Sequence, residues 1–158
     1  MSFFGSLDSS ASGLGAQRLR MDVISQNIAN INTTRSAEGG PYQRRAAIFE
    51  EIGFESALDD AFAIADSTLA GPSRLAARRP LRQGGVRVAE IAKDSLPGPK
   101  VHEPGHPDAD EDGYVSMPNV NIVEEMVDMI SASRSYEANV TAIANTKAMI
   151  AKTMEISR

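Results

Sequence analysis

The fold of this chain is decided by residues 121–156, NIVEEMVDMISASRSYEANVTAIANTKAMIAKTMEI. Apolar side chains recur here every three or four positions without an intervening glycine or proline, which predicts one long amphipathic helix. Asn121 is suited to cap the N-terminus of this helix, with Glu124 three residues later as in a capping box. The apolar positions form two narrow rows with heptad spacing, and this spacing favours coiled-coil packing.

The beginning of the chain carries a weaker pattern of the same kind. Between Leu7 and Ile31, apolar residues again fall on two rows of heptad spacing. Gly13 and Gly15 weaken the first half of this helix by about 1 kcal/mol each relative to alanine. The pattern stops at residues 30–34, NINTT, where short polar side chains compete for backbone hydrogen bonds. We therefore expect a mainly α protein whose long N- and C-terminal helices pack as a coiled coil.

The middle of the chain is rich in glycine, proline, arginine and aspartate and resembles neither end. Alternating apolar residues predict one strand in 42–54 and two or three short strands in 86–117, which together would form a small β module. Residues 55–70 have the spacing of a short helix, and the arginines of 71–85 either bind an acidic partner or belong to a flexible loop. We expect an N-terminal helix in 1–36, a middle region in 37–117 with an insertion at 55–83, and a C-terminal helix in 118–158.

Bulk composition excludes several classes of protein. The 158 residues are 42% hydrophobic and only 5% aromatic, so a large aromatic core is not expected. The absence of cysteine excludes disulfides and thiolate metal sites, and the net charge of −5 argues against nucleic acid as a partner. The sequence has no apolar run long enough for membrane insertion, and its start lacks the features of a cleaved secretory signal.

Two short motifs imitate metal sites. His102-Glu-Pro-Gly-His106 has the spacing of a zinc protease motif, but the proline and glycine inside it oppose the required helix. The acidic run from Asp108 to Gly113 resembles the first half of a calcium-binding loop, yet Asn119 stands where a bidentate glutamate is needed. A loop with no bound ion is the favoured interpretation of both motifs. No catalytic constellation is present, so we expect no enzyme activity, no metal and no cofactor.

Both ends of the chain also resemble a known family in their amino-acid sequence. Residues 11–34, ASGLGAQRLRMDVISQNIANINTT, resemble the start of the bacterial flagellar axial proteins, the rod, hook and hook-associated family, including its A-N-x-N-T motif at 29–33. Residues 116–156 resemble the matching C-terminal end. Within this family, EGGPYQRR at 38–45 and GHPDADEDGYVSMPNVN at 105–121 look most like the proximal rod members.

This resemblance implies a structural subunit of the flagellar rod. Members of the family leave the cell through the flagellar type III export apparatus without a cleaved signal, and they assemble helically in the periplasmic part of the basal body. Copies of the same chain and other proximal and distal rod proteins would be the partners. The assembled rod would transmit torque from the motor to the hook. The alternative is a cytoplasmic coiled-coil adaptor, which explains the heptads but not the family motifs.

The resemblance and the heptad rows together predict the residues that join subunits. The expected helix–helix interface consists of Leu14, Met21, Ile24, Ile28, Ile31, Ile122, Met126, Met129, Tyr136, Val140, Ile143, Ile150 and Met154. A polar motif at the end of the first helix consists of Asn27, Asn30, Asn32 and Thr33. These amide side chains are candidates for hydrogen bonds between helices, or they simply terminate the first helix.

Overall fold

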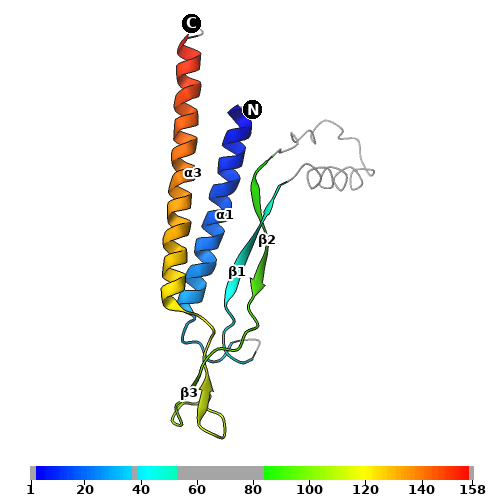
Figure 1. Cartoon of the computed structure of the whole chain (residues 1–158), viewed down its shortest axis with the longest axis vertical. Helices are drawn as coiled ribbons and strands as arrows, with labels where there is room; N and C mark the ends of the chain where they lie inside the picture. Colours follow the sequence, from blue (N-terminus) through cyan, green and yellow to red (C-terminus); the bar gives the residue numbers. More distant parts are fainter. Residues whose placement is uncertain (1–2, 37–38, 53–83, 157–158) are drawn as a thin grey trace, which may run out of the picture. The chain divides into compact units, whose positions relative to one another are not determined.

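A computed structural model describes residues 3–36, 39–52 and 84–156. Along the chain these residues form helix α1 (Phe3–Ala29), strands β1 (Arg45–Glu51), β2 (Val86–Lys93), β3 (Lys100–His102) and β4 (Tyr114–Ser116), and helix α3 (Ile122–Ile156) (Figure 1). Over these residues neither helix has the length and apolarity needed to cross a lipid bilayer. The protein is therefore mainly α, with short strands between two long terminal helices.

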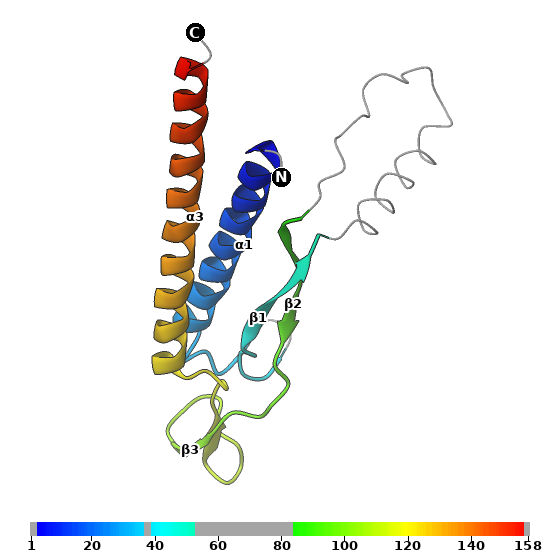
Figure 2. The same ribbon diagram turned by 45° about the horizontal axis from the view of Figure 1, so that its top comes forward.

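The chain divides into two compact units, and each contains a segment of both helices. Unit 1 comprises residues 1–16, 49–87 and 136–158, and unit 2 comprises residues 17–48 and 88–135. Within each unit the segments of α1 and α3 lie side by side and run in opposite directions (Figures 1 and 2). The expected packing of the two terminal helices is thus confirmed.

The first pair of strands forms a two-stranded ribbon. In unit 2 the N–H of Asp94 donates to the carbonyl of Arg44 at 2.8 Å, and in unit 1 the N–H of Ile52 donates to the carbonyl of Gly85 at 3.0 Å. Since the start of β1 is thereby matched with the end of β2, the two strands are antiparallel. Val86 at the start of β2 also donates its N–H to the hydroxyl of Ser12 on α1 at 3.1 Å.

The second pair of strands is a short antiparallel hairpin. Lys100 pairs with Ser116, Val101 with Val115 and His102 with Tyr114. The rings of His102 and Tyr114 meet edge to face with their centroids 5.0 Å apart. Gly113 precedes β4 with a φ of +77°, a conformation that favours glycine. The acidic loop therefore folds back tightly onto the strands of this hairpin.

The start of α3 is fixed by a cap and by a close backbone approach. The side-chain oxygen of Asn121 accepts a hydrogen bond from the N–H of Val123 at 3.0 Å, so Asn121 caps the helix as the sequence predicts. Just before it, residues 117–119 lie against Gly98. A side chain at Gly98 would overlap the carbonyl oxygen of Met117. Glycine is thus required at position 98, where the segment that follows β2 contacts the segment that precedes α3.

The strand predictions for 42–54 and 86–117 are confirmed by β1 and by β2, β3 and β4. The helix predicted in 55–70, the basic loop and the insertion at 55–83 fall almost wholly in residues 53–83, outside the described residues. Helix α1 begins at Phe3 and so extends beyond the first predicted heptad position, Leu7.

Candidate functional site: a buried polar clasp and an exposed helix face

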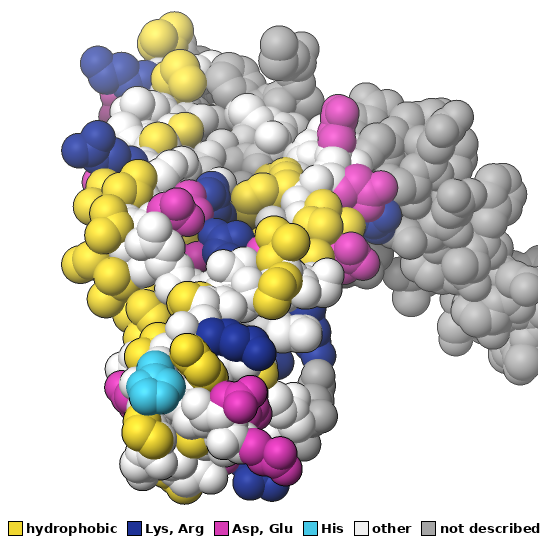
Figure 3. Space-filling view, turned by 60° about the horizontal axis from the view of Figure 1, so that its bottom comes forward, with side chains coloured by type: hydrophobic (Ala, Val, Ile, Leu, Met, Phe, Trp, Pro, Cys, Tyr) yellow, Lys and Arg dark blue, Asp and Glu magenta, His cyan; other side chains and the backbone are white. Residues whose placement is uncertain are grey.

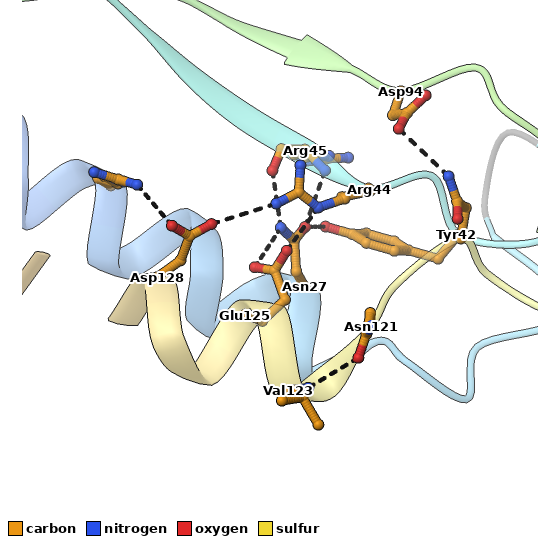
Figure 4. Close-up of polar contacts among 11 residues, drawn as sticks. Asn27, Tyr42, Arg44, Arg45, Asp94, Asn121, Val123, Glu125 and Asp128 are labelled. Carbon is orange, nitrogen blue, oxygen red and sulfur yellow. Dashed lines mark hydrogen bonds and ion pairs between the residues drawn. The ribbon is translucent and has the colours of Figure 1, made fainter. Parts of the chain in front are cut away.

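The core of unit 2 contains a polar cluster centred on Asn27, a side chain near the end of α1. Its amide nitrogen donates to the carbonyl of Arg45 at 2.8 Å and to the carboxylate of Glu125 at 3.0 Å. Its amide oxygen accepts from the hydroxyl of Tyr42 at 2.9 Å and from the N–H of Arg45 at 3.0 Å. All four hydrogen-bonding positions of the amide are therefore filled, and one side chain joins α1, β1 and α3 (Figure 4).

Glu125 supplies the charge of this cluster, although it is 0% exposed. One carboxylate oxygen accepts from Nε of Arg44 at 2.7 Å, and the other accepts from Asn27. Arg44 reaches a second carboxylate, that of Asp128, at 3.6 Å, and Arg20 on α1 binds Asp128 at 2.9 Å. The buried negative charge is thus paired and hydrogen-bonded on both oxygens, the condition under which a buried carboxylate is tolerated.

Tyr42 completes the cluster. Its side chain is buried, and this burial is the main reason why the pKa of its phenol is raised. The negative charge of Glu125 also raises this pKa, and the positive charge of Arg45 partly opposes the increase. The guanidinium carbon of Arg45 lies 5.7 Å from the centre of the Tyr42 ring. The phenol therefore stays protonated and can donate to Asn27. We call Asn27, Tyr42, Arg44, Glu125 and Asp128 the polar clasp.

The face that α3 turns inward carries small or polar side chains, whereas that of α1 also buries Val23 and Ile24. On α3 the buried positions Glu125, Ala132 and Thr146 belong to a single heptad row, which also contains Asn139. In unit 1, the amide of Asn139 lies so close to Gly13 that a side chain at Gly13 would meet it at 2.9 Å. Small residues such as these let two helix backbones approach closely, and the polar ones fix their register.

The predicted interface residues lie around these inward faces with varying exposure. Only Ile24 among them is buried. Those that are half-buried are Leu14, Met21, Ile28, Ile31, Met129, Tyr136, Ile143 and Ile150, and those that remain exposed are Ile122, Met126, Val140 and Met154. In the single chain, most residues of the predicted interface are thus still accessible to another molecule.

The first turns of α3 carry the densest exposed apolar surface of unit 2. Five side chains at helical spacing are between 44% and 64% exposed: Ile122, Val123, Met126, Val127 and Ile130. We call them the α3 stripe. Figure 3 shows hydrophobic side chains gathered along this side of the molecule. Exposed apolar area in such a continuous group is typical of protein–protein contact.

The predicted polar motif has a divided role. Asn27 belongs to the polar clasp, whereas Asn30 closes the last turn of α1 by donating from its side chain to the carbonyl of Gln26 at 2.8 Å. Thr33 donates its hydroxyl to the side chain of Asn30 at 3.2 Å, and its carbonyl accepts from the N–H of Tyr42 at 3.0 Å. Asn32 is exposed. Within the motif, Asn27 thus contacts α3, while Asn30 and Thr33 lie at the end of α1.

The two metal-like motifs lie in a hairpin and its loop. His102 ends β3, and His106 lies in the following turn, where its Nδ1 accepts from the N–H of Asp108 at 3.1 Å. Asp108 accepts from the hydroxyl of Thr34 at 2.8 Å, so the acidic loop is held against the end of α1. Within the part of the chain that the structure describes, no three histidine, aspartate or glutamate side chains gather to hold a metal ion.

Sequence reasoning missed most of the polar clasp. It assigned a candidate role to Asn27 but none to Tyr42, Arg44, Glu125 or Asp128. The sequence did contain one signal for it, because a tyrosine and two arginines at 42–45 could pair with a glutamate in the first turn of α3. The two segments are distant in sequence, so their contact becomes visible only in the folded chain.

Comparison with known proteins places this geometry in a family. Residues 7–35 match the family described as "Flagella basal body rod protein", and residues 111–156 match "Flagellar basal body rod FlgEFG protein C-terminal". Over nearly its whole length the chain is similar to proteins named flagellar basal-body rod protein FlgC. Identity is 46% with that of Borreliella burgdorferi, covering 99% of this chain and 98% of the relative. It is 41% with that of Bacillus subtilis and 34% with that of Salmonella typhimurium, both over 100% of each chain.

Proposed function

The chain belongs to the flagellar basal-body rod protein FlgC family, whose members are structural subunits of the proximal rod and not enzymes, and we propose that it joins its neighbours through the apolar rows of α1 and α3. Membership in this family implies assembly with other rod subunits. The full-length similarity to rod proteins gives no support to the alternative of a cytoplasmic adaptor.

The observation that carries the proposal is that α3 uses different faces for contact within the chain and for exposure to solvent. Its inward heptad row is small or polar, so contact within the chain does not use up the large apolar side chains. The α3 stripe and the half-buried rows beside it therefore remain available. Burying a fully exposed aliphatic side chain contributes about 1.5–3 kcal/mol, and a half-exposed one contributes roughly half of that. Five such residues per subunit, repeated along the rod, would hold a stiff shaft together.

Specific partners follow from the same surface. Copies of this chain and other proximal and distal rod proteins are the proposed neighbours, because a rod of related subunits offers similar helices on every side. Met126, Met129 and Met154 lie on these rows, and the flexible thioether side chain packs against partners that are not identical. A shaft with such contacts would transmit torque from the motor to the hook.

The small core supports a route through the type III export apparatus without a cleaved signal. Among the described residues, the buried hydrophobic core is small and consists of Ala16, Val23, Ile24, Tyr42, Val115 and Ala132. Stability rises with the apolar surface that folding removes from water, so a single subunit with so small a core would unfold readily. Such a chain could be exported unfolded and gain its full stability from neighbours in the rod.

The proposal is tested by placing a charge in the α3 stripe. Met126→Asp and Val127→Asp change exposed residues, so they leave the core of the subunit intact. We expect both variants to be exported and to be absent from purified basal bodies, with loss of swimming. Ser131→Asp is the matched control, since it adds the same charge at an exposed position of α3 outside the stripe. Normal rods and swimming with Val127→Asp would refute the proposal.

A further inference from the structure

The hydroxyl of Ser12 joins α1 to the start of β2 within unit 1. Its Oγ donates to the carbonyl of Ser9 at 2.7 Å and accepts from the backbone N–H of Val86 at 3.1 Å. A serine hydroxyl has a single proton, so the bond to Ser9 fixes the direction in which its lone pairs point. Because the Ser9 carbonyl is within reach when this turn is helical, the helix orients the acceptor that binds Val86.

The end of the ribbon is shaped to reach this hydroxyl. Gly85, the residue before β2, has a φ of +142°, which favours glycine. A Cβ at Gly85 would lie 2.8 Å from the Oγ of Ser12, closer than side chains approach one another. The carbonyl of Gly85 also accepts from the N–H of Ile52 at 3.0 Å, so β1 and β2 are still joined here. Glycine at 85 thus lets the end of the ribbon contact α1, and we call Ser12, Gly85 and Val86 the Ser12 latch.

The part of α1 that carries this latch gains little stability from its own sequence. Residues 3–16 contain three glycines, which disfavour helix formation. Among residues 5–16, only Gly13 and Ala16 are buried. Segments with few buried contacts open readily. A hydrogen bond from the ribbon therefore adds appreciably to the order of this half of the helix.

We propose that the Ser12 latch couples folding of the first half of α1 to fixing of the ribbon end, with Ser12 as the positioning residue. The helix orients the hydroxyl that holds Val86, and the bond to Val86 in turn favours the helical turn. Coupling of this kind is reciprocal, so a change on either side is felt on the other. The inference goes beyond the proposed function, because it concerns how one chain orders its own parts.

A simpler role for Ser12 makes the opposite prediction. Serine in a helix often bonds to the backbone of the preceding turn and does nothing else. Alanine has a higher helix propensity than serine, so Ser12→Ala would then slow amide hydrogen exchange in residues 5–16. If Ser12 is the latch, the same substitution removes the acceptor of Val86 and speeds exchange both at Val86 and in the helix.

The first experiment measures amide hydrogen exchange by mass spectrometry on the full chain in purified basal bodies. We expect Ser12→Ala to speed exchange at Val86 roughly ten-fold, as for the loss of one hydrogen bond, and to speed it in residues 5–16 as well. Ser12→Thr keeps a hydroxyl and should restore the wild-type rates. Ser9→Ala is the matched control, because it removes an exposed hydroxyl from the same turn and should not speed exchange.

The second experiment changes the ribbon and observes the helix. Gly85→Ala places a Cβ against the hydroxyl of Ser12, whereas Gly84→Ala enters open space. Both residues have positive φ, +142° and +80°, so both alanines strain the backbone. Since only the first displaces the latch, only Gly85→Ala should speed exchange in residues 5–16.

Unchanged or slower exchange in residues 5–16 of Ser12→Ala would overturn the proposal, and so would equal effects of Gly84→Ala and Gly85→Ala on the helix. Failure of Ser12→Thr to restore the rates would show that the hydroxyl is not the coupling group. A chain that is absent from basal bodies is measured instead as the purified full chain. Absence of the wild-type chain from basal bodies would count against the proposed function alone, so the two failures are distinguishable.

Discussion

Replacing Glu125 by alanine should destabilise the subunit more than any exposed substitution on α3. The carboxylate is fully buried and binds Arg44 at 2.7 Å and Asn27 at 3.0 Å. Removing one partner of a buried ion pair costs about 3–5 kcal/mol, because the other charge is left without compensation. Arg44 is 28% exposed and lies 3.6 Å from Asp128, so it keeps some solvation and one carboxylate. We therefore expect a loss at the lower end, about 3 kcal/mol.

The measurement is urea unfolding of the purified chain followed by far-UV circular dichroism. Glu124→Ala is the matched control, because it removes an exposed carboxylate from the same first turn of α3 and should cost no more than about 1 kcal/mol through the helix dipole. Replacing Arg44 and Glu125 together by methionine and leucine should recover much of the loss, since no buried charge then remains. A loss below about 1 kcal/mol for Glu125→Ala would show that the polar clasp does not hold the helices and β1 together.

Three further predictions follow from particular contacts. Gly98→Ala should lower the free energy of unfolding in urea by about 2 kcal/mol, because its side chain would meet the backbone at Met117. Gly105→Ala is the control, since its side chain enters open space and should leave the free energy of unfolding nearly unchanged. Equal effects of the two substitutions would contradict the packing at Gly98. The raised pKa of Tyr42 means that the folded chain keeps the phenolic proton after the unfolded chain loses it, so this contribution to stability is full below pH 10.0 and falls above it. Tyr42→Phe should reduce that fall between neutral and strongly alkaline urea titrations, and an unchanged fall would exclude this phenol as its cause. Ile28→Asp and Ile143→Asp should abolish rod assembly but leave export intact, as judged from culture medium and basal-body fractions, and a motile strain with either change would contradict the role of these rows.

The terminal helices could be predicted from the sequence because their signals are local. The periodicity of 121–156 and the cap at Asn121 depend only on neighbouring residues, and both appear in the structure as predicted. The strands could be placed for the same reason, since alternation is a property of a few consecutive residues. The hairpin register depended on Gly113 and on the fold of the acidic loop, and alternation alone does not specify it.

The inward face of α3 could not be predicted from hydrophobic periodicity. That method assumes that the most apolar row is the buried one, whereas here the buried row of α3 contains Glu125, Ala132 and Thr146. Burial of Glu125 depends on Arg44 and Asn27, which lie 81 and 98 positions away in the chain. A subunit that must present apolar surface to its neighbours departs from the usual pattern in just this way, with polar residues holding its own helices.

The most direct test of the account is a cryo-EM map of isolated basal bodies at side-chain resolution. The account predicts that Val123, Met126 and Val127 are buried against a neighbouring rod subunit, while Glu125 keeps its bonds to Arg44 and Asn27 of its own chain. A map in which the α3 stripe faces solvent, or in which Glu125 pairs with a residue of another subunit, would contradict it.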